Sequence, residues 1–280
     1  MIAQPQEMKT IRIKPPPRGV DLNLAEAWAH RELLYFFVWR QLKLRYKQTL
    51  IGAGWAILQP LLTMLTFSLI FGRLARLPSD GIPYPVFYYS GLLPWMYFTN
   101  ALTAATNTMV DHQRVITKVY FPRILLPVAA VLAGLADFAI ALVVLLLVLM
   151  PMYGVAVTAA VLALPVFLLL AVLTAVGVGL WLSALYAVYR DVRYLLPFLV
   201  MLWMFLSPVV YPSSMVPGPW RWLYGLNPMA GVIEGFRWAL TGSAQPSGSL
   251  LVASTAAVGL LLLGGILCFQ RLEATIADVV

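Results

Sequence analysis

The sequence is poor in charged and redox-active residues. Of its 280 residues only 11% are Asp, Glu, Lys or Arg, whereas 61% are apolar or aromatic. Soluble domains carry roughly 25% charged and about 45–50% apolar residues. The composition therefore excludes a water-soluble globule, and it is the reverse of a disordered chain. A single cysteine, Cys268, excludes an internal disulfide framework.

The sequence also lacks the usual motifs of catalysis and nucleotide binding. It contains no H-E-x-x-H, no Cys/His metal spacing and no G-x-S-x-G. It has no G-x-x-x-x-G-K-[ST] either, so the chain cannot bind ATP through a P-loop of its own. We expect no catalytic residue, no metal and no cofactor on this chain. Any motor must be another polypeptide.

What the sequence has instead is a series of long uncharged windows, over residues 48–72, 81–110, 138–189, 194–220 and 238–270. About 20 residues cross a bilayer as a helix. The third window would be about 78 Å long as one helix, so it must turn back, at Pro151–Gly154. We expect an all-α membrane protein with six transmembrane helices, at about 50–72, 87–109, 126–150, 158–186, 194–211 and 249–269.

The distribution of Lys and Arg predicts the orientation of these helices. Fifteen of the 19 lie in the N-terminal segment, the 110–125 and 187–196 loops and the tail, and four lie on the opposite face. The positive-inside rule then places both termini in the cytoplasm. We expect a mobile Pro-rich tail over 1–23, a membrane domain over 49–270 and a cytoplasmic tail over 271–280. The net charge of +8 belongs to this orienting surface and requires no nucleic acid.

Residues 24–48 combine a helical apolar pattern with a basic end. One face would carry Leu33, Leu34, Phe37, Val38, Gln41, Leu42 and Arg45. The segment is too charged to span a bilayer, so we expect an amphipathic helix in the plane of the cytoplasmic surface. Its cations could serve only to fix the orientation of the chain, or they could form a docking surface for a cytoplasmic partner. Charge alone does not separate these alternatives.

Asp137 is the one carboxylate deep inside a predicted span. An ionised carboxylate at the centre of a bilayer costs at least a few kcal/mol, so Asp137 should face the bundle interior and find donors. It could be a gating or proton-linked residue, or a polar contact that fixes helix packing. Ion-coupled transporters usually carry several such groups.

Aromatic residues gather at two places that we predict to lie toward the outside. The first set lies in the outer part of the second span, and the second set lies in a 38-residue external segment between spans five and six. The members are Tyr88, Tyr89, Trp95, Tyr97, Phe98, Trp220, Trp222, Tyr224 and Trp238. They could form an interfacial belt, or line a path for sugar rings. The external segment is too apolar for a solvated loop. We expect short helices broken at Pro217, Pro219 and Asn227–Pro228 that dip back toward the membrane and keep Trp and Phe buried.

Several stretches together resemble a known family. They are WRQLKLRYKQTLIGAGWAILQPLLTMLTFSLIFG (39–72), YYSGLLPWMYFTNAL (88–102), KVYFPRILLPVAAVLAGLADF (118–138), YRDVRYLLPFLVMLWMFLSPVVYP (189–212) and LNPMAGVIEGFRWAL (226–240). These stretches resemble the permease subunit of polysaccharide and polyol-phosphate ABC exporters. Members of this type-2 family export O-antigen, capsular polysaccharide or teichoic acid. The resemblance covers about residues 28–272, and O-antigen exporters are the most similar subtype.

The resemblance implies partners and site residues. It implies a homodimer in the bacterial inner membrane, with two separate cytoplasmic ATPase subunits that bind ATP and Mg. Residues 24–48 would be the interface helix, with Arg40, Lys43, Arg45 and Lys47 near the ATPase. Residues 116–127 would be a coupling helix, with contacts from Lys118, Tyr120, Phe121, Pro122 and Arg123, and Arg190 and Asp191 would form a second contact. Two periplasmic gate helices would match Trp220 to Trp238.

The expected function is therefore ATP-driven export of a lipid-linked, O-antigen-like polysaccharide through a channel between two copies of the chain. Two alternatives stay open. An ABC exporter of a small drug or lipid would use the same scaffold. A membrane-embedded transferase is disfavoured, because the sequence lacks an acid/base cluster.

Overall fold

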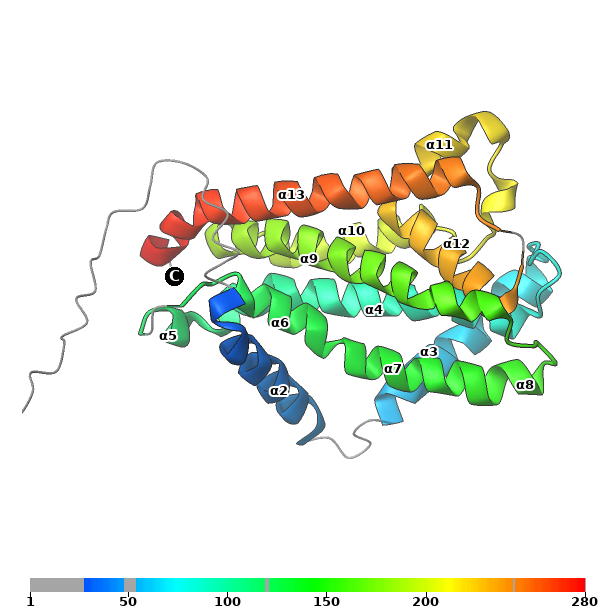
Figure 1. Cartoon of the computed structure of the whole chain (residues 1–280), viewed down its shortest axis with the longest axis horizontal. Helices are drawn as coiled ribbons and strands as arrows, with labels where there is room; N and C mark the ends of the chain where they lie inside the picture. The colour runs from blue at the N-terminus through cyan, green and yellow to red at the C-terminus, as the bar shows by residue number, and fades with distance from the viewer. Residues whose placement is uncertain (1–27, 48–53, 119–120, 244, 280) are drawn as a thin grey trace, which may run out of the picture.

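The computed structural model describes residues 28–47, 54–118, 121–243 and 245–279, the last six without their side chains. Within these residues every element is helical and none is a strand. The long helices run side by side along the longest axis of an elongated bundle (Figure 1). The predicted all-α membrane fold is confirmed.

The first half of the chain forms α2 and three longer helical segments. The elements are α2 (Arg31–Lys47), α3 (Gly54–Phe67) with its π-helical continuation η1 (Ser68–Leu74), α4 (Tyr84–Asp111) and α5 (Gln113–Ile116). A bent helix follows, made of α6 (Leu125–Ala133), α7 (Leu135–Val144), η2 (Leu145–Leu149) and α8 (Met150–Met152). Gly134 lies at the bend between α6 and α7.

The second half begins with η3 (Ala159–Ala163), α9 (Leu164–Val188) and α10 (Val192–Phe205). Four short elements follow, namely η4 (Ser213–Met215), η5 (Gly218–Trp220), α11 (Arg221–Tyr224) and α12 (Pro228–Thr241). Helix α13 (Gly248–Val279) ends the described chain. The predicted breaks at Pro217, Pro219 and Asn227–Pro228 all fall between or at the start of these short helices.

Four segments are long and apolar enough to cross a membrane, namely Gly54–Leu74, Leu125–Met152, Ala159–Val188 and Gly248–Glu273. They match the predicted first, third, fourth and sixth spans. Helix α10 is apolar but has only 14 residues. Helix α4 has 28 residues, but its Tyr, Thr and Asn residues lower its hydropathy. The count of six spans therefore stays a prediction.

Helix α4 lies at the centre of the core, in contact with α3, α6, α7, α9, α10 and α12. Most of its residues from Val86 to Met109 are buried, including Phe87, Tyr88, Tyr89 and Phe98. The middle of a single chain is therefore filled with side chains.

Helices α9 and α13 cross in close backbone contact at a pair of glycines. A Cβ atom added to Gly265 would lie 2.2 Å from the carbonyl oxygen of Gly177. One added to Gly177 would lie 2.8 Å from the backbone nitrogen of Leu262. Small residues let membrane helices approach in this way and gain van der Waals contact.

The two ends of the bundle carry different elements. Helix α5, the junction of α9 with α10 and the last turns of α13 lie at one end (Figure 1). Helices α8 and α11 lie at the opposite end. The loops that the charge distribution predicts to be cytoplasmic therefore share one end of the molecule.

The glycine crossing predicts that Gly265→Ala destabilises the protein by about 1–3 kcal/mol, the usual cost of overpacking. Gly259→Ala in the same helix is the control, because its added Cβ would meet no atom within 4 Å. We expect the thermal unfolding midpoint in detergent to fall for Gly265→Ala and to stay level or rise for Gly259→Ala. Equal midpoints for the two variants would contradict the crossing.

Candidate functional site

Helix α2 has the inner face that its sequence predicts. Phe37 is buried, and Leu33, Leu34, Val38, Gln41 and Leu42 are half-buried. This face packs against α6. Residues 24–27 and Gln48, at the two ends of the predicted segment, lie outside the described residues.

The outer face of α2 combines exposed aromatic rings with cations. Trp28, Tyr35, Phe36 and Trp39 are exposed. Arg40, Lys43 and Lys47 are exposed as well, and the Lys43 ammonium lies 4.7 Å from the centre of the Trp39 ring. A basic and aromatic face of this kind suits the headgroup region of a membrane or an acidic protein surface.

The loop after α5 contacts other parts of the chain through two predicted coupling residues. Phe121 is only 4% exposed, and its ring centre lies 5.5 Å from that of Phe37 in α2. Arg123 donates a hydrogen bond of 2.7 Å to the carbonyl oxygen of Glu273 in α13. Phe121 therefore joins the loop to α2, and its expected contact with an ATPase stays a prediction. Arg123 likewise has a partner within the chain.

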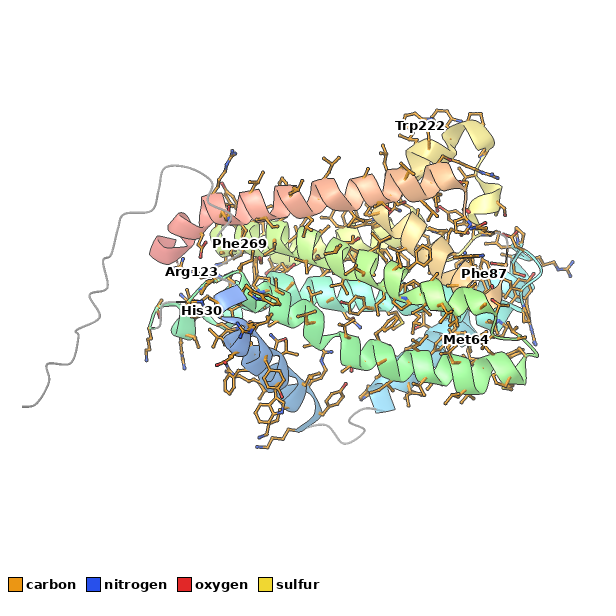
Figure 2. All side chains as sticks on the ribbon, viewed as in Figure 1. His30, Met64, Phe87, Arg123, Trp222 and Phe269 are labelled. Carbon is orange, nitrogen blue, oxygen red and sulfur yellow. The ribbon has the colours of Figure 1, made fainter. Side chains whose placement is uncertain are left out.

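Other predicted coupling residues do lie on the surface of the same end. Lys118 is exposed, Pro122 is half-buried, and Arg190 and Asp191 are exposed at the junction of α9 with α10. Tyr120 lies outside the described residues. Figure 2 shows His30, Arg123 and Phe269 close to one another at this end, far from Phe87 and Trp222. We call Lys118, Arg190, Asp191 and the outer face of α2 the basic end.

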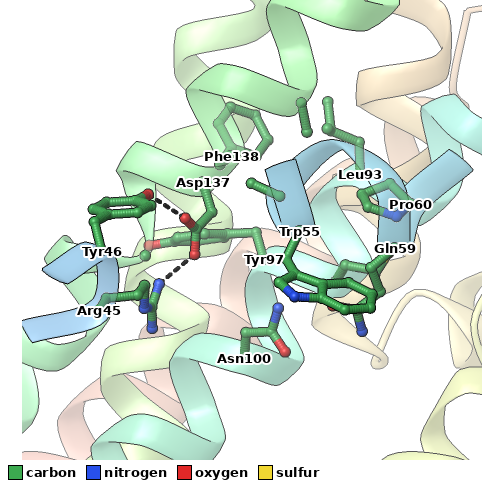
Figure 3. Close-up of a pocket in the computed structure, with 14 residues that line it drawn as sticks. Arg45, Tyr46, Trp55, Gln59, Pro60, Leu93, Tyr97, Asn100, Asp137 and Phe138 are labelled. Carbon is green, nitrogen blue, oxygen red and sulfur yellow. Dashed lines mark hydrogen bonds and ion pairs between the residues drawn. The ribbon is translucent and has the colours of Figure 1, made fainter. Parts of the chain in front are cut away.

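Asp137 links α2 to the bent helix. Its carboxylate accepts hydrogen bonds from the Arg45 guanidinium and the Tyr46 hydroxyl (Figure 3). Burial and the hydrogen bond to Asp137 raise the pKa of Tyr46 to about 12, so Tyr46 stays a donor at neutral pH. This arrangement favours the packing interpretation of Asp137. Arg45, expected near the ATPase, points to Asp137 instead.

The five predicted path aromatics of α4 are buried within the chain, namely Tyr88, Tyr89, Trp95, Tyr97 and Phe98. The Tyr89 hydroxyl donates to the carbonyl oxygen of Ala141 at 3.1 Å. The Phe98 ring lies 5.0 Å from that of Trp203 in α10. These rings therefore pack helices together, and their role as a path lining stays a prediction.

The predicted gate aromatics are divided between surface and interior. Trp220 and Trp222 are 60% and 59% exposed, contrary to the expected burial of these rings. The Tyr224 hydroxyl donates to that of Tyr211 at 3.3 Å, and Trp238 packs edge-on against Phe167 at 6.3 Å. Helix α12 itself returns into the bundle between α4, α9 and α13.

Asn227 fixes the beginning of α12. Its side-chain amide donates to the carbonyl oxygen of Leu206 at 3.0 Å and to the Ser207 hydroxyl at 2.9 Å. Its side-chain oxygen accepts from the Trp203 indole at 2.8 Å and caps the helix at Met229. One residue thus joins the end of α10 to the start of α12.

Arg237 is a functional candidate that the charge count does not reveal. It is buried, and it donates to Glu234 and to the carbonyl oxygen of Pro208, each at 2.9 Å. Its guanidinium carbon lies 3.8 Å from the centre of the Phe87 ring. The only sequence signal is the spacing of Glu234 and Arg237, which places them on one helix face. Arg237 holds α12 against both α4 and the end of α10.

In the part of the chain that the structure describes, no three His, Cys, Asp or Glu side chains come together in a group that could hold a metal ion.

Comparison with known proteins places this arrangement in a family. The family model described as ABC-2 type transporter matches residues 32–241. The O-antigen export system permease protein RfbA of Myxococcus xanthus is 32% identical over 241 residues, which cover 85% of this chain and 91% of RfbA. A protein of the same name from Klebsiella pneumoniae is 28% identical over 74% of this chain and 79% of its own length.

A third relative is the polysialic acid transport protein KpsM of Escherichia coli, which is 25% identical over 70% of this chain and 76% of its own length. The family model covers three quarters of the chain, from α2 to the end of α12. The matched residues take in the helices of the bundle from α2 to α12, and α13 follows them. The chain belongs to the ABC-2 type transporter family of membrane proteins.

Proposed function

We propose that the chain is the transmembrane subunit of an ATP-driven exporter that moves a lipid-linked, O-antigen-like polysaccharide across the bacterial inner membrane. The observation that carries the proposal is the similarity to RfbA of Myxococcus xanthus over nearly the whole of both chains. The other relatives named above are also named for the export or transport of a glycan. The absence of a P-loop from the sequence supports a separate ATPase.

The basic end is the proposed docking surface for a cytoplasmic ATPase subunit, one on each copy of the chain. Lys118, Arg190 and the outer face of α2 offer exposed cations at the end where the predicted cytoplasmic loops meet. Phe121 and Arg123 act from inside, because they join the loop to α2 and to α13. A displacement of this surface would therefore act on α2, on α13 and on α6, which follows the loop in the chain.

The path for the glycan is proposed to lie between two copies of the chain. A long polymer cannot be enclosed in one pocket, and α4 fills the centre of a single chain. Helices α3 and α10 expose apolar side chains that include Leu62, Leu65, Phe198 and Leu202. These faces would meet lipid or a second copy, which supports a homodimer. Helices α11 and α12, with Trp220 and Trp222, would cap the outer end.

Charge reversal at the basic end tests the docking surface. We expect Lys118→Glu with Arg190→Glu to lower the amount of ATPase that co-purifies with the chain about tenfold, because the new carboxylates would repel an acidic surface on the ATPase. Arg73→Glu with Arg76→Glu is the matched control, since both residues are exposed and lie near the opposite end. Equal loss in both pairs would contradict the assignment.

Substitutions in the buried pair of Arg237 and Glu234 test how α12 is held in the bundle. Arg237→Met leaves Glu234 without its cation, which should lower the free energy of unfolding by about 3–5 kcal/mol and reduce export. The double variant Arg237→Met/Glu234→Met should recover much of the loss, because an apolar pair replaces a broken ion pair. Thermal unfolding and surface glycan measure the two effects. A double variant no better than Arg237→Met would refute the pairing.

Deletion of the gene tests the substrate class. The deleted cells should lose glycan from their surface and accumulate the lipid-linked glycan on the cytoplasmic side, and the intact gene should restore export. Electron microscopy with a glycan-specific antibody on sealed and opened cells distinguishes the two sides. Unchanged surface glycan together with increased sensitivity to a drug would instead indicate an exporter of small molecules.

A further inference from the structure

A cavity of about 200 Å³ lies where α2, α3, α4 and the bend between α6 and α7 meet. Figure 3 shows the Arg45, Tyr46 and Asp137 group on one side of it, with Trp55 and Gln59 of α3 on the other. Asn100 of α4 also lines it. Neither the docking surface nor the outer cap includes this cavity.

The polar groups of the cavity suit a neutral ligand that both donates and accepts hydrogen bonds. Arg45 and Asp137 neutralise each other, and both side chains remain partly exposed. Gln59 and Asn100 are exposed, and among the described residues their side-chain amides have no hydrogen-bond partner. Each amide offers a donor and an acceptor. A simple anion would meet Asp137 and a simple cation would meet Arg45, whereas hydroxyl groups can pair with all four residues.

The remaining wall of the cavity is aromatic and apolar. Trp55 is 50% exposed and presents its indole there. Leu93, Met96 and Phe138 also line the cavity. An aromatic face beside amides and an ion pair matches the two characters of a sugar ring, with its apolar C–H face and its polar hydroxyls.

The position of the cavity fits the entry of a substrate from the side of the basic end. Asp137 lies 12 residues after Leu125, where the bent helix begins near that end. That separation corresponds to about 18 Å along a helix. Arg45 and Tyr46 of α2 line the cavity, so a ligand there would also contact the helix proposed to dock the ATPase.

We propose that this cavity binds one sugar unit of the exported glycan as it enters from the cytoplasmic leaflet. Trp55 stacks on the ring, Gln59 and Asn100 pair with its hydroxyls, and the ion pair of Arg45 with Asp137 closes the site. This assignment rests on the proposed export of a glycan. It adds a binding site in which the bound sugar would contact α2 directly, through Arg45 and Tyr46.

A photo-crosslinking residue tests the site in cells that make their own lipid-linked glycan. Benzoylphenylalanine replaces Trp55 in one variant and Leu260 of α13 in the control, which is 72% exposed and does not line the cavity. After irradiation of the intact complex with its ATPase, we expect a glycan-stained ladder on the chain only for the variant at position 55. A phospholipid adduct alone, no adduct, or equal ladders at both positions would overturn the proposal.

A second measurement needs no crosslinker. Asn100→Leu should raise the concentration of the purified lipid-linked glycan that half-saturates stimulation of ATP hydrolysis about tenfold, with unchanged co-purification of the ATPase. Asn107→Leu on the same helix is the control and should leave this concentration unchanged. An unchanged concentration for Asn100→Leu would overturn the site. Surface glycan is compared in parallel between cells with and without the gene. Equal amounts in the two would refute the proposed function instead.

Discussion

The cost of a charge in an apolar interior determines where the polar groups of this chain lie. Asp137 is held by Arg45 and Tyr46 of α2, and Arg237 by Glu234, Pro208 and the Phe87 ring. A buried charge without partners would cost several kcal/mol. Each group therefore links elements that are far apart in sequence, α2 to α7 in one case and α12 to α4 and α10 in the other.

The first of these links ties α2 to the bent helix, the second holds α12 in the core, and closely packed helices join the two regions. The glycine crossing of α9 with α13 and the buried rings of α4 show that the helices between these two links are closely packed. Movement at the basic end can thus be transmitted as displacement of whole helices. Such a chain suits a permease whose energy comes from a partner, because the described residues offer paired charges rather than a relay of ionisable groups.

The sequence predicted features that depend on one segment alone. Uncharged windows located the apolar helices, and the spacing of Leu33, Phe37 and Val38 identified the inner face of α2. Features that depend on a neighbour could not be predicted in this way. Phe121 faces inward because Phe37 covers it, Arg45 turns to Asp137, and Trp220 and Trp222 stay exposed. Nothing in the charge pattern indicates that Arg237 is buried, because its partners at Pro208 and Phe87 are remote in sequence.

Reconstitution tests the central claim, that this chain is a conduit driven by a separate ATPase. The purified chain is placed in sealed vesicles with its lipid-linked glycan, with and without the ATPase, and protection of the glycan from an added glycosidase is measured. The account predicts that the glycan changes sides only when the ATPase and hydrolysable ATP are both present. Movement without the ATPase, or hydrolysis of ATP by this chain alone, would contradict it.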